Sequence, residues 1–133
     1  LIENYDPNLP PVLGEANSLE QIVINLLTNA RDALEDRSDG QITIETGLHD
    51  DGKCVYAALR VRDNGPGVPP EIRQQIFDPF FTTKDPNKGT GLGLAISLEI
   101  AQKHGGVLKL NEATQGAEFV LCVPVAESRK EAA

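Results

Sequence analysis

The chain has 133 residues, 40% of them hydrophobic, which predicts one domain with a single hydrophobic core. Its 20 acidic and 12 basic residues give a net charge of −8, which argues against nucleic acid or an anionic membrane as a partner, because both attract clusters of Lys and Arg. Cys54 and Cys122 lack disulfide or zinc spacing, and no apolar run reaches the roughly 20 residues of a membrane span. We therefore expect a cytoplasmic chain without membrane contact, and a membrane anchor elsewhere in the parent protein stays open.

A long helix is expected first, over Ala16–Asp36. Asn17 or Ser18 is expected as its N-cap, and Ser18 and Gln21 have the spacing of a capping box. Apolar residues recur at three- and four-residue steps and form one stripe, made of Leu19, Ile22, Val23, Leu26, Ala30, Ala33 and Leu34. We expect this buried stripe to pack on a sheet.

Two strands are expected next, over Gln41–Leu48 and Lys53–Arg62, with Asp51 and Gly52 in the turn of an antiparallel hairpin. In the second strand the inward residues are expected to be Val55, Ala57, Leu59 and Val61. A short helix around Glu71–Gln75 then leads to an irregular stretch, 78–88, whose aromatic, polar and basic composition is typical of a mobile lid.

The C-terminal part begins with a second long helix, expected over Leu92–His104 and closed by Gly105 and Gly106, with cations in its last turn. Two final strands are expected near Val107–Asn111 and Ala117–Pro124. Residues 1–126 therefore form the predicted domain, and residues 127–133 a charged, disordered tail. The chain opens without a methionine, which indicates a piece of a longer protein.

The first helix carries a polar stripe beside the apolar one, because Gln21, Asn25 and Asn29 follow one another at four-residue steps. A solvated surface face explains such a stripe equally well. Asparagine is unfavourable inside a helix, however, and an amide oxygen is a suitable ligand for Mg²⁺ when a polyphosphate supplies further oxygens. Asn29 is therefore a candidate metal ligand.

Asp63 ends a buried strand and leads into the loop Asn64-Gly65-Pro66-Gly67. The glycines allow close backbone approach to a flat ligand, and the carboxylate could accept a hydrogen bond from an amino group. Taken alone, the tripeptide Asp-Asn-Gly is explained at least as well by a tight turn.

Glycines precede the second long helix in the segment Lys88-Gly89-Thr90-Gly91-Leu92-Gly93, where backbone N–H groups and the helix dipole could bind phosphate. The segment matches neither a P-loop nor a dinucleotide fingerprint, so its signal alone is weak. Just before it, Phe77, Phe80 and Phe81 fit either core packing or contact with a partner helix, and Lys84 and Lys88 could reach phosphates.

Together these blocks resemble, in order, the N, G1, F and G2 boxes of sensor histidine kinases, whose superfamily shares the Bergerat fold with gyrase B, Hsp90 and MutL. The resemblance rests on residues 25–30, 63–67, 77–84 and 89–94 and runs from about Pro11 to Val125. The segments Asn29–Ala33 and Phe80–Lys84 are most similar to the nitrogen-regulation subgroup. The fold implied is an α/β sandwich, a mixed and largely antiparallel sheet with helices on one face.

The resemblance implies an ATP site between the first long helix and the lid. Asp63 would bind the adenine amino group, Asn29 would ligate Mg²⁺, and Asn25 would support the phosphate and metal side, which makes both asparagines catalytic positions. The residues implied in ATP binding are Asn25, Asn29, Asp63, Gly65, Gly67, Lys84, Lys88, Gly89, Thr90, Gly91, Leu92, Gly93 and Leu94.

The implied partner is a helical dimerisation domain that carries the phosphoacceptor histidine and contacts Phe77, Phe80 and Phe81. The parent protein would be a homodimer with a downstream response regulator, and this piece alone a monomer. Two positions depart from many relatives, since Asp32 and Ala33 stand where a phosphate-binding Lys and an adenine-stacking ring are common. Lys84, Lys88 or Arg31 could replace the cation.

Two further classes stay open at this point, an ATP-hydrolysing machine domain and a nucleotide-binding module without catalysis. The hydrolysing branch of the superfamily has a general-base Glu one turn before the metal Asn, where this chain has Asn25, and an amide cannot accept a proton at neutral pH. His49, in the expected hairpin turn, and His104, at a helix end, do not begin a phosphoacceptor motif. We therefore expect a chain that binds Mg-ATP and does not phosphorylate itself.

Overall fold

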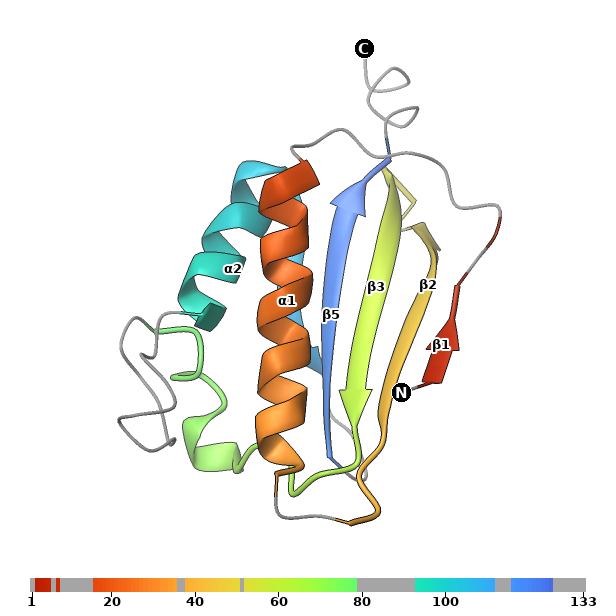
Figure 1. Ribbon diagram of the computed structural model, residues 1–133. Coiled ribbons are helices and arrows are strands. Elements are labelled where there is room, and N and C mark those ends of the chain that lie inside the picture. The colour runs from red at the N-terminus through yellow and green to blue at the C-terminus, as the bar shows by residue number, and fades with distance from the viewer. Residues whose placement is uncertain are drawn as a thin grey trace.

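The computed structural model describes residues 2–5, 7, 16–35, 38–50, 52–78, 93–111 and 116–125. It has two layers, a five-stranded sheet and two α-helices that share one face of it (Figure 1). The elements are β1 (Ile2–Asn4), α1 (Ala16–Ala33), β2 (Ile42–Asp50), β3 (Val55–Asp63), the 3₁₀ turn η1 (Pro70–Ile72), α2 (Gly93–Lys103), β4 (Val107–Asn111) and β5 (Ala117–Pro124). The predicted α/β sandwich is confirmed.

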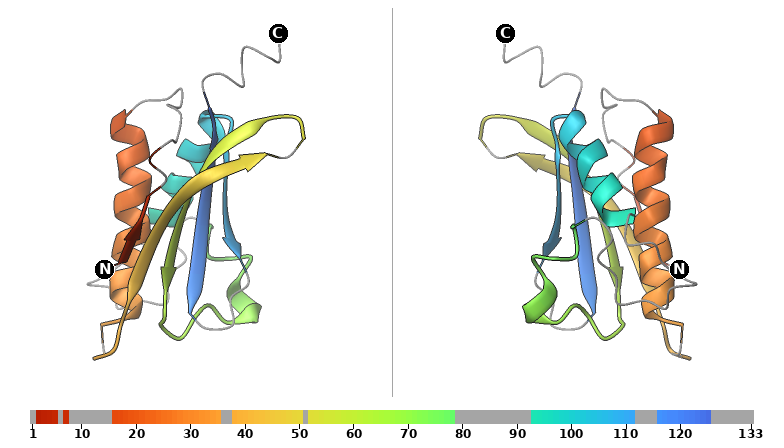
Figure 2. Two further views of the ribbon diagram at one scale, coloured as in Figure 1. Left: turned by 90° about the vertical axis from the view of Figure 1, so that its right-hand side faces the viewer. Right: turned by 90° about the vertical axis from the view of Figure 1, so that its left-hand side faces the viewer.

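The strand order in the sheet is β1-β2-β3-β5-β4. The pairs β2–β3, β3–β5 and β4–β5 are antiparallel, whereas β1 pairs with β2 in parallel. The hairpin of β2 and β3 is confirmed, and its tip curves away from the rest of the sheet (Figure 2). His49 lies in β2 opposite Tyr56, so the prediction that placed it in the turn is wrong.

The bounds of β4 and β5 agree with the prediction, and those of β2 and β3 differ from it by one or two residues. Strand β1 was not predicted. It has three residues, all exposed, and therefore lacks the alternation of apolar and polar residues by which a strand is found in a sequence.

Helix α1 buries the predicted stripe against the sheet, and Ile22 and Leu26 are both 0% exposed. The helix begins at Ala16, so Asn17 and Ser18 lie inside its first turn and the predicted N-cap is wrong. It ends at Ala33 rather than at Asp36, because the next two N–H groups bond to carbonyls three residues back, which tightens the last turn. Ala33 is exposed, contrary to its place in the predicted stripe.

The core lies between the helices and the inward side chains of the sheet. Phe119, Leu121 and Val123 of β5 point to this side together with Val61 of β3. The opposite face of the sheet carries a smaller cluster in which Ala58, Val120 and Cys122 are buried beside Tyr56. The main core is therefore formed where α1 and α2 pack on one face of the sheet.

Helix α2 ends as the sequence predicts. The N–H of Gly106 donates to the carbonyl of Ala101 and that of Gly105 to the carbonyl of Gln102, the two bonds of a Schellman motif. The ring Nδ1 of His104 lies 2.8 Å from the carbonyl oxygen of Ile100. The end of α2 is thus closed by its own backbone, and His104 caps the helix as expected.

The predicted helix around Glu71–Gln75 is instead the 3₁₀ turn η1, which is followed by further turns. Pro70 opens it, and its backbone continues in bonds between residues three apart, from Ile72, Arg73 and Gln75. Arg73 Nη2 donates to the carbonyl of Leu110 at 3.1 Å, so the segment is attached to β4.

The two cysteines are expected to differ in reactivity. Burial raises the pKa of the Cys122 thiol, whereas Cys54 is only half-buried. A thiol reagent should therefore modify Cys54 in the native protein and Cys122 only after denaturation, with Cys54→Ser abolishing the native reaction. Rapid labelling of Cys122 in the native protein would contradict this difference in reactivity.

The raised pKa of Cys122 also predicts how stability depends on pH. Because the pKa of this thiol is higher in the folded chain, the unfolded chain loses the proton first, and the free energy of unfolding should decline as pH rises above 9.0.

Candidate nucleotide site

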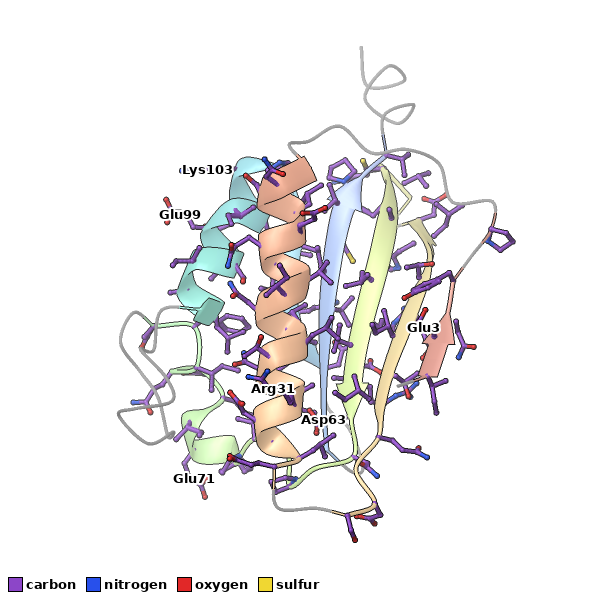
Figure 3. All side chains as sticks on the ribbon, in the orientation of Figure 1. Glu3, Arg31, Asp63, Glu71, Glu99 and Lys103 are labelled. Carbon is purple, nitrogen blue, oxygen red and sulfur yellow. The ribbon has the colours of Figure 1, made fainter. Side chains whose placement is uncertain are left out.

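The predicted site residues within the described part of the chain lie along the second half of α1, beside the end of β3 and the start of α2. Figure 3 shows Asp63 at the end of β3 beside the last turns of α1, which also carry Arg31. Helix α2 begins next to the middle of α1 (Figure 1). Segments that are distant in sequence therefore meet along the second half of α1, with Gly93 at its middle and the Asp63 loop at its end.

Asp63 is 5% exposed, and its Oδ1 accepts a hydrogen bond from the N–H of Gly65 at 2.9 Å. The next residue, Asn64, holds the loop to the start of β2. Its Oδ1 accepts from the N–H of Gln41 at 2.7 Å, and its Nδ2 donates to the carbonyl of Asp39 at 2.9 Å. The loop therefore forms the tight turn that the sequence permits, and its hydrogen bonds hold the buried Asp63 carboxylate in a fixed position.

The two glycines of this loop leave little room for a side chain. A Cβ on Gly65 would lie 3.0 Å from Asp63 Oδ1 and 3.1 Å from the carbonyl oxygen of Ala33. A Cβ on Gly67, whose φ is +80°, would lie 2.8 Å from the carbonyl oxygen of Gly116. The end of α1 and the residue before β5 therefore both contact the Asp63 loop directly.

Gly116 packs against the Asp63 loop, and the sequence did not predict this contact. Its φ is +75°, and a Cβ there would lie only 1.8 Å from the carbonyl oxygen of Asp63. Its one local signal is a glycine immediately before the last strand, which is also the ordinary signal of a turn. Its contact with Asp63 could be found only from the pairing of β3 with β5.

Asn25 connects the two helices. Its Nδ2 donates to the carbonyl of Gly93 at 3.1 Å and to the hydroxyl of Ser97 at 3.0 Å, and its Oδ1 accepts from Gln21 Nε2 at 3.1 Å. Gly93 is the last glycine of the predicted phosphate segment and the first residue of α2. The polar stripe of α1 is therefore more than a solvated surface, since it bonds the start of α2.

Asn29 lies one turn further along α1 and is half-buried. Asp32, in place of a phosphate-binding lysine, is 17% exposed at its side chain and lies 3.6 Å from the guanidinium of Arg31. The Arg31 side chain is 74% exposed, so its guanidinium lies at the surface near the end of α1. Ala33 contributes its backbone and methyl group beside Gly65 rather than a ring.

Phe77 packs its ring edge-on against Phe119, with centroids 6.3 Å apart, and so contributes to the core. Leu94 also packs on the core from the first turn of α2. The other predicted positions lie outside the described residues, namely Phe80, Phe81, Lys84, Lys88, Gly89, Thr90, Gly91 and Leu92. Their predicted roles, and the contact of Phe77 with a partner domain, stay predictions.

The donor set fits a metal that arrives with a polyphosphate better than a metal held by the protein alone. Within the described ranges, no group of three His, Cys, Asp or Glu residues could hold an ion. The amides of Asn25 and Asn29 instead lie one turn apart on α1. Mg²⁺ commonly binds through few protein ligands when phosphates of the substrate supply further oxygens.

Among the described helices, none is long and apolar enough to cross a membrane.

Solved structures with this fold include histidine kinase catalytic domains. The catalytic domain of histidine kinase ThkA superimposes with a TM-score of 0.76 at 32% identity, covering 92% of this chain and 78% of that one. The full-length kinase ShkA in complex with AMPPNP gives a TM-score of 0.71 at 31% identity, over 92% of this chain and 25% of that one.

Curated relatives are sensor kinases. The sensory histidine kinase/phosphatase NtrB of Rhizobium meliloti is 38% identical over 94% of this chain and 35% of its own length. The two-component sensor PprA of Pseudomonas aeruginosa is 42% identical over 86% of this chain and 13% of its own length. The chain thus spans about a third or less of these relatives. Residues 14–127 match the family model described as histidine kinase-, DNA gyrase B-, and HSP90-like ATPase. The chain therefore belongs to that family of ATPases, and its resemblance to sensor histidine kinases is confirmed.

Proposed function

We propose that this chain binds Mg-ATP and presents its γ-phosphoryl group to a histidine on a separate helical domain in two-component signalling. Membership of the ATPase family supports the use of a nucleotide. The observation that carries the choice of kinase over ATP hydrolysis is the Asn25 amide. It occupies the position of a general base, yet it donates both its hydrogen bonds to α2 and cannot take a proton from water.

The site residues have proposed roles in binding, including those that lie outside the described part of the chain. The buried Asp63 carboxylate accepts a hydrogen bond from the adenine amino group, and Gly65 and Gly67 keep the loop clear of side chains. Asn29 ligates Mg²⁺ through its amide oxygen. Lys84, Lys88 and residues 89–94 bind the phosphates, and the exposed Arg31 is a second source of positive charge.

The chemistry proposed is transfer of one phosphoryl group. An imidazole nitrogen of the acceptor forms a bond to the γ-phosphorus while the bond to the bridging oxygen of ADP breaks, and that oxygen keeps the electron pair. In such transfers the protein mainly positions the reactants and stabilises the developing charge, and amides and backbone N–H groups suffice for both. No residue of this chain needs to become a covalent intermediate.

The acceptor is proposed to lie outside this chain, in a helical dimerisation domain that Phe77, Phe80 and Phe81 contact. The similarity to only part of each sensor kinase supports this division. The two histidines are poorly suited as acceptors, since His49 lies in a paired strand beside Tyr56 and His104 caps α2. A homodimeric parent, a cytoplasmic location and a downstream response regulator belong to the same proposal.

The test uses ATP labelled at the γ-phosphate, incubated with this chain alone and with the purified helical domain of the same protein. We expect acid-labile, base-stable label on the helical domain and none on this chain. The Asp63→Asn variant in the same mixture should give no label. Stable label on the chain alone would contradict the proposal that the acceptor lies on a separate domain. Steady release of phosphate without label would favour an ATP-hydrolysing domain.

A further inference from the structure

Ser97 is a buried polar residue to which the nucleotide reaction assigns no role. Among the described residues only Asp63 and Ser97 are both polar and buried, and Ser97 is 0% exposed. A hydroxyl in a core costs folding free energy unless it is hydrogen-bonded. One turn later on the same face of α2, Ala101 is also 0% exposed, so a methyl group satisfies the packing there. The hydroxyl of Ser97 therefore needs an explanation other than volume.

Its partner is Asn25. The Nδ2 group donates to Ser97 Oγ at 3.0 Å and to the carbonyl of Gly93 at 3.1 Å, so the amide meets two acceptors one turn apart on α2. The opposite orientation would place Oδ1 against the carbonyl of Gly93, which pairs two acceptors. The two bonds therefore determine which way the Asn25 amide points, and its Oδ1 is left to accept from Gln21.

The same bonds determine where α2 begins relative to α1. Asn25 lies one turn before Asn29, the proposed Mg²⁺ ligand, and Gly93 ends the glycine segment proposed to bind phosphates. A shift of α2 along α1 would change the distance between metal and phosphate groups. Catalytic and binding groups tolerate little misplacement, because their interactions depend on geometry.

We propose that Ser97 is a positioning residue of the nucleotide site. Its hydroxyl oxygen holds the Asn25 amide, and through Asn25 it fixes the start of α2, at Gly93, beside the proposed metal-binding face of α1. The inference rests on the proposed function, since it assumes that Mg-ATP occupies this site.

The test is a double-mutant cycle on Mg-ATP affinity, measured by calorimetry on the whole chain. Ser97→Ala should weaken binding about fivefold, the usual effect of one lost hydrogen bond. Ser97→Cys, which keeps a group at the γ position but replaces the hydroxyl by a larger thiol that is a weak acceptor, should weaken it similarly. In the Asn25→Ala background, Ser97→Ala should cause no further loss, because both variants break the same contact.

The control is Ala101→Gly, which also removes a buried group from this face of α2. It should lower the free energy of unfolding in guanidinium and leave Mg-ATP affinity unchanged. Unchanged affinity in Ser97→Ala, additive losses in the cycle, or an equal loss in Ala101→Gly would overturn the positioning role. If the unaltered chain itself fails to bind Mg-ATP, the proposed function fails instead, so the two failures are distinguishable.

Discussion

Replacement of Asp63 by asparagine is expected to weaken ATP binding by roughly 100-fold and to leave the fold intact. The variant keeps the shape of the side chain and can keep the Oδ1 acceptor for the N–H of Gly65. The other carboxylate oxygen becomes an NH₂ group, however, which faces the adenine amino group with a second donor. A charged acceptor is lost and two donors oppose each other in a buried position, where unsatisfied groups are costly.

Calorimetry with Mg-ATP and Mg-GTP would measure this effect. Guanine has an acceptor where adenine has the amino group, so the ratio of ATP to GTP affinity should fall in the variant. Asp50→Asn is the matched control, because Asp50 Oδ1 likewise accepts from the N–H two residues on, that of Gly52 at 2.8 Å, but in the exposed hairpin. Equal ATP affinity in the Asp63 and Asp50 variants would remove Asp63 from the adenine role.

Gly116→Ala is expected to lower the free energy of unfolding by about 3 kcal/mol or more and to abolish ATP binding. The new Cβ would lie 1.8 Å from the carbonyl oxygen of Asp63 and 3.0 Å from the Cα of Asn64, both backbone atoms that cannot rotate away. The start of β5 must therefore separate from the end of β3, which displaces the Asp63 loop.

Gly52→Ala separates this steric effect from backbone strain. Gly52 also has a positive φ, +90°, but a Cβ there meets nothing within 4 Å. Its substitution should cost only the conformational term, about 1 kcal/mol, and leave ATP affinity unchanged. Denaturant unfolding of both variants, followed by calorimetry at a temperature where each is folded, gives the comparison. Similar losses in the two variants would show that strain alone matters at Gly116.

Much of the fold could be predicted because its signals are local. Strands β4 and β5 and the Schellman end of α2 are encoded by alternating apolar residues and by Gly105 and Gly106. The end of α1 could not, because its last turn tightens through hydrogen bonds from Leu34 and Glu35 to carbonyls three residues back. The parallel pairing of β1 with β2 joins segments about 40 residues apart and leaves no pattern within β1 itself.

Part of the candidate site could likewise be predicted from the sequence, and part could not. Asp63, Gly65 and Gly67 lie close together in one loop of the sequence, and Asn25 and Asn29 share a helix face, so their spacing alone brings each group together. Ser97 and Gly116 could not be found in this manner. In sequence, one is a small residue in a helix and the other a glycine before a strand, and neither type is unusual at such a place.

The sequence by itself determined the family, because the family is marked by short motifs with fixed spacing, and the resemblance to that family in turn implied the two-layer fold and the residues of an ATP site. Only the tertiary structure decided how the motifs are held together. The Asn25 amide joins α1 to Gly93 and Ser97 across 68 and 72 residues, and Gly116 packs on Asp63 across the β3–β5 pair. The physical reason is that hydrogen bonds and close contacts act over a few ångströms in space, whatever the separation along the chain.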